Sequence, residues 1–137
     1  MMNEATTLKS ILLVDDEPDI LTVAEIALNQ VGGFNVRAYN SSLLAVEDAE
    51  EIMPDLIILD MMMPNMDGMQ TLKKLRGINS LSQTPIIFMT AKVQKNEVDT
   101  YIKAGANGVI EKPFDPMLLS EQVVNIFDDC MTRRNHE

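Results

Sequence analysis

The sequence is poor in residues on which several classes of protein depend. It has one cysteine, Cys130, among 137 residues, so an internal disulfide is excluded and we expect an idle thiol in a reducing compartment. No apolar run approaches the ~20 residues of a membrane-spanning helix. The first ten residues lack the basic segment and apolar run of a signal peptide. We therefore predict a cytoplasmic protein without membrane insertion.

Basic residues are also scarce. The 11 Lys and Arg residues face 21 Asp and Glu residues, which gives a formal net charge of -10. Such a field repels nucleic-acid phosphates and anionic lipids, so we expect no direct nucleic-acid partner. Cations and basic protein surfaces are the better candidates. The only histidine, His136, lies in the polar stretch "TRRNHE" and is predicted to have no phosphorelay role.

Short apolar runs alternate with helical patterns along the chain, without a repeat or a linker. One domain is predicted over residues 8–131, with short flexible ends at 1–7 and 132–137, and we expect no output domain after it. Five alternating strands and helices favour an α/β fold with a parallel sheet and right-handed crossovers. The predicted strands are 11–14, 35–38, 56–59, 85–89 and 108–110, and the predicted helices are 20–31, 43–52, 68–76, 96–104 and one starting at Pro116 after Asp115 as N-cap.

Polar residues follow four of these strands directly. In an open α/β sheet, ligands bind outside the carboxyl ends of the strands. Three carboxylates gathered there repel one another unless a cation lies among them, and hard oxygen ligands suit Mg²⁺. A carboxylate at such a site can itself attack phosphorus and form an aspartyl phosphate. The residues concerned are Asp15, Asp16, Asp60, Thr90 and Lys112.

Four motifs together carry a family resemblance over about residues 8–131. They are "ILLVDDEP", "DLIILDMMMPNMDGM", "PIIFMTA" and "GVIEKPF", in this order. Each is weak alone, but with this order and spacing the chain resembles the receiver domain of two-component response regulators, in particular single-domain chemotaxis regulators. The resemblance implies a flavodoxin-like, doubly wound five-stranded parallel sheet of order 2-1-3-4-5 with five helices.

The resemblance also implies a role for each carboxylate. Asp60 would be the phosphoacceptor. Asp16 and Asp60 would bind Mg²⁺ directly, Asp15 would act largely through water, and the backbone carbonyl of Met62 would complete the metal site.

Two residues would bind the phosphoryl group by the same resemblance. Thr90 would bind one phosphoryl oxygen in the active state and Lys112 would pair with another, with a cis peptide bond between Lys112 and Pro113. The sequence departs from the family at Val109, where the usual residue is aromatic. We therefore expect the signal to be carried by backbone shifts near Thr90 instead of by an aromatic ring at Val109.

The predicted function is a phosphorylation-controlled signalling domain, not an enzyme in the usual sense. A histidine kinase or a histidine phosphotransfer protein would phosphorylate Asp60, with the domain catalysing part of this transfer and of the later hydrolysis itself. Output would be phosphorylation-dependent binding of a downstream protein, a phosphorelay step, or both. Met62 and Lys92, two residues after Asp60 and Thr90, are the positions expected to tune the lifetime of the phosphoryl group.

Three other interpretations are weaker. A Mg²⁺-dependent phosphatase of haloacid dehalogenase type needs a second aspartate two residues after the nucleophile, where Met62 stands. A nucleotide-binding flavodoxin-like protein would offer glycines and N–H groups after its first strand, not two aspartates. Met63, Met66 and Met69 could bind Cu(I) through their thioethers, but methionine also fills cores, and packing is the favoured interpretation.

Overall fold

Five short strands form one parallel sheet in the computed structural model, which describes residues 7–135. Their order is β2-β1-β3-β4-β5, so the predicted flavodoxin-like, doubly wound order is confirmed. The strands follow the predicted apolar runs to within one or two residues at each end. They are β1 (Ser10–Val14), β2 (Asn35–Tyr39), β3 (Leu56–Asp60), β4 (Ile86–Thr90) and β5 (Gly108–Glu111).

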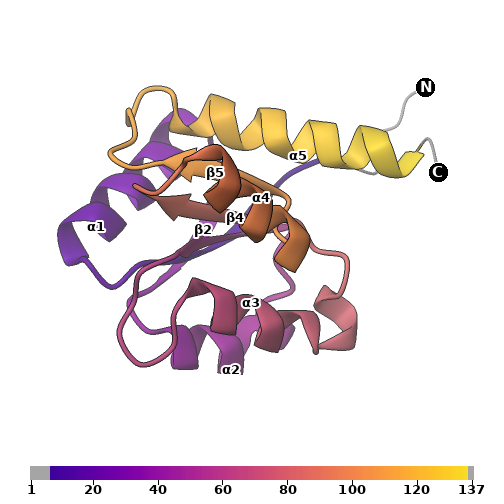
Figure 1. The fold of residues 1–137 in the computed structure, drawn as a ribbon. Coiled ribbons are helices and arrows are strands. Elements are labelled where there is room, and N and C mark those ends of the chain that lie inside the picture. The colour runs from indigo at the N-terminus through magenta and orange to yellow at the C-terminus, as the bar shows by residue number, and fades with distance from the viewer. Residues whose placement is uncertain (1–6, 136–137) are drawn as a thin grey trace.

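Helices connect successive strands and cover both faces of the sheet (Figure 1). The predicted five α-helices are present, together with a π-helical turn that extends the first of them and a short 3-10 turn. These elements are α1 (Pro18–Ile26), η2 (Ala27–Val31), α2 (Ser42–Ile52), α3 (Gly68–Arg76), η3 (Asn79–Leu81), α4 (Lys95–Ala104) and α5 (Leu119–Asn135).

Two apolar cores lie on the two faces of the sheet. Side chains alternate along a strand, so neighbouring residues of β3 enter different cores. Leu56 and Ile58 pack with α1 and α5, whereas Ile57 and Leu59 pack with α2, α3 and Tyr101 of α4. Each fully buried Leu or Ile contributes roughly 1.5–3 kcal/mol. Both faces of β3 are therefore covered, as its uninterrupted apolar sequence predicts.

The first helix differs from its prediction at its C-terminal end. The predicted span 20–31 is divided into a regular α1 and the π-turn Ala27–Val31. Gly33, which follows the π-turn, has a left-handed backbone, with φ of 74°. Gly32 is needed for a different reason, because a Cβ there would lie 2.4 Å from the Ser120 hydroxyl oxygen of α5.

The last helix begins later than predicted. Asp115 caps a turn, since its side chain accepts from the Met117 N–H at 2.9 Å and its carbonyl accepts from the N–H of Leu119 at 3.0 Å. Regular helix starts only at Leu119, so Pro116 belongs to this turn and not to the first helical position.

The last helix also continues beyond the predicted domain limit at Met131. It extends through Asn135, and the side chains of Arg133 and Asp129 form an ion pair of 3.0 Å along it. The expected domain boundary therefore falls inside a helix. His136 lies outside the described residues. No helix within residues 7–135 combines the length and apolar character needed to cross a membrane.

Candidate functional site

The carboxyl edge of the sheet gathers the polar residues that the sequence places after its strands. Asp60 ends β3 and Thr90 ends β4, and they are only 3% and 1% exposed. Asp15 follows β1 and is completely buried, and Lys112 follows β5. In register, Val14 lies beside Leu59, so Asp15 and Asp60 leave adjacent strands side by side.

Lys112 is the centre of this cluster. Its Nζ lies 2.9 Å from Asp15 Oδ2 and 3.1 Å from Asp60 Oδ1, and its side chain is only 14% exposed. A third carboxylate, that of Glu17, lies 3.7 Å away. The sequence interpretation missed Glu17. The feature that could have identified Glu17 is its position two residues after Asp15. Asp15 Oδ1 accepts a hydrogen bond from the Glu17 N–H at 2.9 Å, which directs the Glu17 side chain toward the site.

Burial and charge shift the pKa values of two of these groups in the same direction. Burial raises the pKa of the Asp60 carboxyl to about 6, and the negative charge of Asp15 adds to this, against the opposing ammonium of Lys112. For Lys112, burial acts to lower its pKa, but the Asp15 and Asp60 carboxylates together outweigh it and raise that pKa above the usual value. The lysine is therefore a permanent cation at neutral pH.

Three carboxylates meet closely enough to share a cation. Asp15, Asp16 and Asp60 each offer an oxygen within 4.8 Å of the other two. One of these groups is incompletely satisfied. Apart from its ion pair with Lys112, the buried Asp15 Oδ2 has no hydrogen-bond partner among the described residues. Hard oxygen donors, with a buried carboxylate oxygen that has room for a further partner, fit a divalent cation such as Mg²⁺.

The loop after β3 is fixed by backbone contacts. The Met62 N–H donates to Asp60 Oδ1 at 3.3 Å, so the carboxylate is held beside its own loop. The Gly68 N–H donates to the Met61 carbonyl at 2.9 Å, and a Cβ at Gly68 would lie 2.9 Å from Met61 Cα. A glycine is thus required where α3 starts. The Asp67 side chain caps this helix, in a reciprocal arrangement with Gln70.

Thr90 and the loop after β4 are joined by one short hydrogen bond. The Lys92 N–H donates to Thr90 Oγ1 at 3.1 Å, which leaves the hydroxyl proton of Thr90 available for another acceptor. The Lys112–Pro113 peptide bond on the other side of the site is cis, as predicted.

Met63 and Met69 pack against the core, as the favoured interpretation predicted for them. Met61 is 6% exposed, and Met63 and Met69 pack against the core shared by α2, α3 and α4. The Ser42 hydroxyl donates to Met63 Sδ at 3.4 Å, so this sulfur already has a partner. Met66 is half-buried outside both cores, and the side chain of Met62 is 62% exposed beside the carboxylate cluster.

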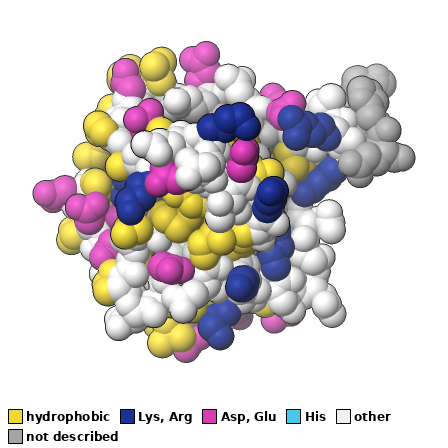
Figure 2. Space-filling model, in the orientation of Figure 1, with side chains coloured by type: hydrophobic (Ala, Val, Ile, Leu, Met, Phe, Trp, Pro, Cys, Tyr) yellow, Lys and Arg dark blue, Asp and Glu magenta, His cyan; other side chains and the backbone are white. Residues whose placement is uncertain are grey.

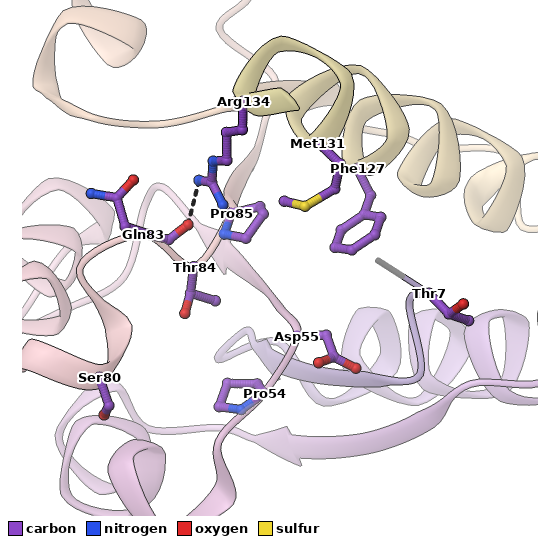
Figure 3. A pocket seen from close by; sticks show the side chains of 10 residues that line it. All are labelled: Thr7, Pro54, Asp55, Ser80, Gln83, Thr84, Pro85, Phe127, Met131 and Arg134. Atoms are coloured by element: carbon purple, nitrogen blue, oxygen red, sulfur yellow. Dashed lines mark hydrogen bonds between the residues drawn. The ribbon is translucent and has the colours of Figure 1, made fainter. Parts of the chain in front are cut away.

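A pocket at the opposite edge of the sheet has a different chemistry (Figure 3). It has a volume of about 280 Å³ and includes Asp55, Phe127, Met131 and Arg134 in its lining. The Asp55 carboxylate accepts from the N–H groups of Lys9 and Ser10, both at 3.0 Å. The Arg134 side chain donates to the Gln83 carbonyl, as the dashed line in Figure 3 shows. These polar groups are satisfied within the chain, so the carboxyl edge is the candidate site.

The fold and the site together define a class, the flavodoxin-like α/β domains with an acidic cluster at the carboxyl edge of the sheet. The chain belongs to the response regulator receiver domain family, whose family model matches residues 11–124. This family is a signalling domain of two-component systems and not a classical enzyme. Neither the match nor the relatives support the haloacid dehalogenase interpretation.

Individual relatives agree with this assignment. The chain is 34% identical to the response regulator Rre1 of Synechocystis, over 85% of this chain and 51% of that protein. It is 35% identical to the alkaline phosphatase synthesis transcriptional regulatory protein PhoP of Bacillus subtilis, over 84% of this chain and 47% of that protein. It thus spans about half the length of these two relatives. The chemotaxis response regulator CheY4 of Vibrio cholerae has a similar structure, with a TM-score of 0.81 and 28% identity over 88% of this chain and 99% of that chain.

Proposed function

We propose that this receiver domain is switched by phosphorylation of Asp60, with a phosphohistidine of a histidine kinase or a histidine phosphotransfer protein as donor. The observation that carries the proposal is the position of the Asp60 carboxylate, 3.1 Å from the Lys112 ammonium and within 4.8 Å of the Asp15 and Asp16 carboxylates. A nucleophilic carboxylate, a cation and further oxygen ligands are the groups that phosphoryl transfer requires.

The chain's own groups suit each part of this transfer. An ionised oxygen of Asp60 forms a bond to phosphorus while the P–N bond of the donor breaks and the imidazole nitrogen keeps the electron pair. With a pKa of about 6, Asp60 is mostly ionised at pH 7. Lys112 neutralises charge on one phosphoryl oxygen, and the free hydroxyl proton of Thr90 is available to another.

A divalent cation has its own place in the proposal. Asp15, Asp16, Asp60 and the backbone carbonyl of Met62 would hold Mg²⁺, with Asp15 acting largely through water. When bound, Mg²⁺ would supply the positive charge that offsets both the clustered carboxylates and the phosphoryl oxygens. Support comes from the three carboxylates within 4.8 Å of one another.

The proposed output is a changed contact with a downstream protein, a phosphorelay step, or both. The surface expected to change comprises α4, β5 and α5, including Lys103, Gly108 and Glu121. Loss of the phosphoryl group by self-catalysed hydrolysis would reset the domain. In this proposal Met62 and Lys92, whose side chains are exposed, control access of water to the phosphoryl group. A cytoplasmic location remains part of the proposal.

The test is chemical modification with a small phosphodonor. Acetyl phosphate with Mg²⁺ should add one phosphoryl group to the protein, detected by intact-mass spectrometry, and Asp60→Asn should abolish it. Asp129→Asn is the matched control, because it makes the same chemical change at an exposed carboxylate of α5. Undiminished modification of the Asp60→Asn protein would contradict the assignment.

A further inference from the structure

A tyrosine on α4 lies directly behind the loop that follows Thr90. Tyr101 is 8% exposed and belongs to the core shared by α2, α3 and α4. Its ring packs edge-on against Phe88 of β4, with ring centroids 5.5 Å apart and an interplanar angle of 84°. This geometry is favourable for an aromatic pair and fixes the direction of the ring. The hydroxyl group therefore has a defined position.

That hydroxyl group bonds to the loop that follows β4. Tyr101 OH donates to the Lys92 carbonyl at 3.1 Å. The N–H of the same residue, Lys92, donates to Thr90 Oγ1 at 3.1 Å. The backbone of Lys92 thus joins two side chains, one beside the phosphorylation site and one on α4. These two hydrogen bonds form a continuous connection from Thr90 to the helix.

We propose that Tyr101 is the residue that couples the loop 91–94 to α4, so that a displacement of Thr90 moves the loop and the helix together. The inference rests on the proposed function, because phosphorylation of Asp60 is what would draw the Thr90 hydroxyl toward a phosphoryl oxygen. Thr90 Oγ1 carries the Lys92 N–H with it, and the Lys92 carbonyl carries the Tyr101 hydroxyl. Packed elements joined in this way move between discrete arrangements.

The neighbouring strand β5 offers no side chain at Val109 that could couple the loop to the helix. Val109 of β5 lies opposite Phe88 in the sheet register and is partly buried against the same core. Valine has no polar atom in its side chain and is stiff about χ1, so it offers the loop no hydrogen bond. Within the described residues, Tyr101 is the side chain that bonds to the Lys92 carbonyl. Its hydroxyl, more than its ring, is the coupling group.

The test removes the hydroxyl and keeps the ring. Tyr101→Phe preserves the packing against Phe88 and deletes only the bond to Lys92. Tyr39→Phe is the matched control, since the Tyr39 hydroxyl bonds to Asp48 of α2. Wild type and both variants are compared by amide chemical shifts with Mg²⁺, before and after addition of beryllofluoride as the phosphoryl mimic.

The two segments should respond differently in the variant. In the wild type and in Tyr39→Phe, we expect shift changes both in residues 90–94 and in residues 95–104, with small ones at Val109. In Tyr101→Phe the changes in 90–94 should remain, while those in 95–104 should fall below about half of their wild-type size. Changes of full size across α4 in Tyr101→Phe would overturn the coupling role.

Two further measurements separate this inference from the proposed function. Acetyl phosphate should modify all three proteins equally, and loss of modification only in Tyr101→Phe would overturn the inference, because Tyr101 would then act on phosphorylation itself. A wild type that accepts no phosphoryl group would overturn the proposed function as well. The chain has no tryptophan, so Tyr101 is the only source of tyrosine emission in Tyr39→Phe. That emission should change with beryllofluoride, and constant emission would contradict the inference.

Discussion

The two edges of the sheet hold their buried charges in opposite ways. At the amino edge, the guanidinium of Arg76 donates to the carbonyls of Leu81, Thr84 and Gly105 and to the side chain of Asn107, at 2.6–3.0 Å. At the carboxyl edge, carboxylates face one another around one lysine, and the Lys112 ammonium is the one partner of the buried Asp15 Oδ2 among the described residues. Satisfied polar groups stabilise a fold, whereas local conflicts of this kind mark a functional site.

The same asymmetry extends to the surface. Most of the Lys and Arg side chains in Figure 2 lie on the side where the chain ends, which is the amino edge. Basic residues in the last helical turns account for this, since helices that connect parallel strands end at that edge and cations there complement the helix dipoles. These residues are Lys73, Lys74 and Arg76 of α3, Lys103 of α4, and Arg133 and Arg134 of α5.

The largest expected effect is on the free energy of unfolding and comes from removing the hydrogen bonds of Arg76 at the amino edge. Arg76→Met removes four hydrogen bonds and takes a donor away from each of the acceptors, so the free energy of unfolding should fall by about 3 kcal/mol in urea titrations. Arg133→Met is the control, because this exposed helical ion pair is worth at most about 0.5 kcal/mol. Acetyl phosphate modification of Asp60 should persist in both variants. Equal stability of the two variants would show that Arg76 has no special role.

The second prediction concerns Mg²⁺ at the unsatisfied edge. A cation that binds only the folded chain stabilises it by mass action, about 2.7 kcal/mol at 100 times its dissociation constant, so Mg²⁺ should raise the melting temperature. Asp16→Ala should remove most of this rise, since Mg²⁺ recruits few protein ligands. Asp19→Ala, a change in the first turn of α1, should keep it. An unchanged melting temperature of the wild type at millimolar Mg²⁺ would count against the site.

The third prediction makes one chemical change at both edges. In the absence of Mg²⁺ at pH 7, Asp60→Asn should raise the free energy of unfolding by about 1 kcal/mol. The pKa of Asp60 is raised by burial and by Asp15, so its ionised form costs stability above pH 6 and this cost fades as the pH falls. Asp55→Asn should instead lower stability by about 1 kcal/mol, because Asp55 accepts from Lys9 and Ser10.

Opposite signs for these two changes would sharpen the contrast between the edges. If both variants lost stability equally, repulsion among the carboxylates would not be a feature of the folded chain. Denaturant titrations at pH 5 and pH 7 measure the difference, and the gain in Asp60→Asn should be smaller at pH 5. The sign follows because the folded chain binds the Asp60 proton more tightly than the unfolded chain does.

The sequence predicts the sheet and the position of the acidic cluster better than the contacts within it. Apolar runs locate the strands, and parallel strands bring Asp15 and Asp60 to one edge whatever their separation in the chain. The contact of Glu17 with Lys112 depends instead on a local turn, in which Asp15 accepts from the Glu17 N–H. The bond from Tyr101 to Lys92 depends on a ring direction set by Phe88.

The ends of the helices are also predicted poorly from the sequence, for a related reason. The π-turn Ala27–Val31 lies inside a continuous apolar pattern, and the hydrogen bond from the Gly32 N–H to the Ala27 carbonyl at 3.3 Å distinguishes it from α-helix. At the start of α5, the pair Asp115–Pro116 suggests a helical cap, yet the chain first makes a turn. Both features are defined by local hydrogen bonds that the pattern of apolar residues does not specify.

The smallest expected effect concerns a half-buried hydrogen bond near the carboxyl edge. The Tyr39 hydroxyl donates to Asp48 Oδ2 at 2.6 Å, and this bond, with a contribution from burial, raises the pKa of the Tyr39 phenol above its usual value. Tyr101→Phe leaves Tyr39 as the only tyrosine, so absorbance near 295 nm reports its titration alone. Asp48→Asn in that background should bring the pKa down toward the ordinary value.

The sign of the stability effect follows from the same shift. A phenol whose folded pKa is raised contributes stability that is complete below its unfolded pKa of about 10 and is lost as the pH rises through the folded value. The loss should be small, because both side chains are partly exposed and water screens the charge of Asp48. Only one group of this pair, the Asp48 carboxylate, is charged, and the two groups are hydrogen-bonded to each other. The pKa of Tyr39 should therefore respond weakly to salt and not at all to Mg²⁺. A Mg²⁺-dependent shift in the pKa of Tyr39 would show that the cation affects the part of the site next to β2. The repulsion among carboxylates at the carboxyl edge would then extend further than Asp15, Asp16 and Asp60.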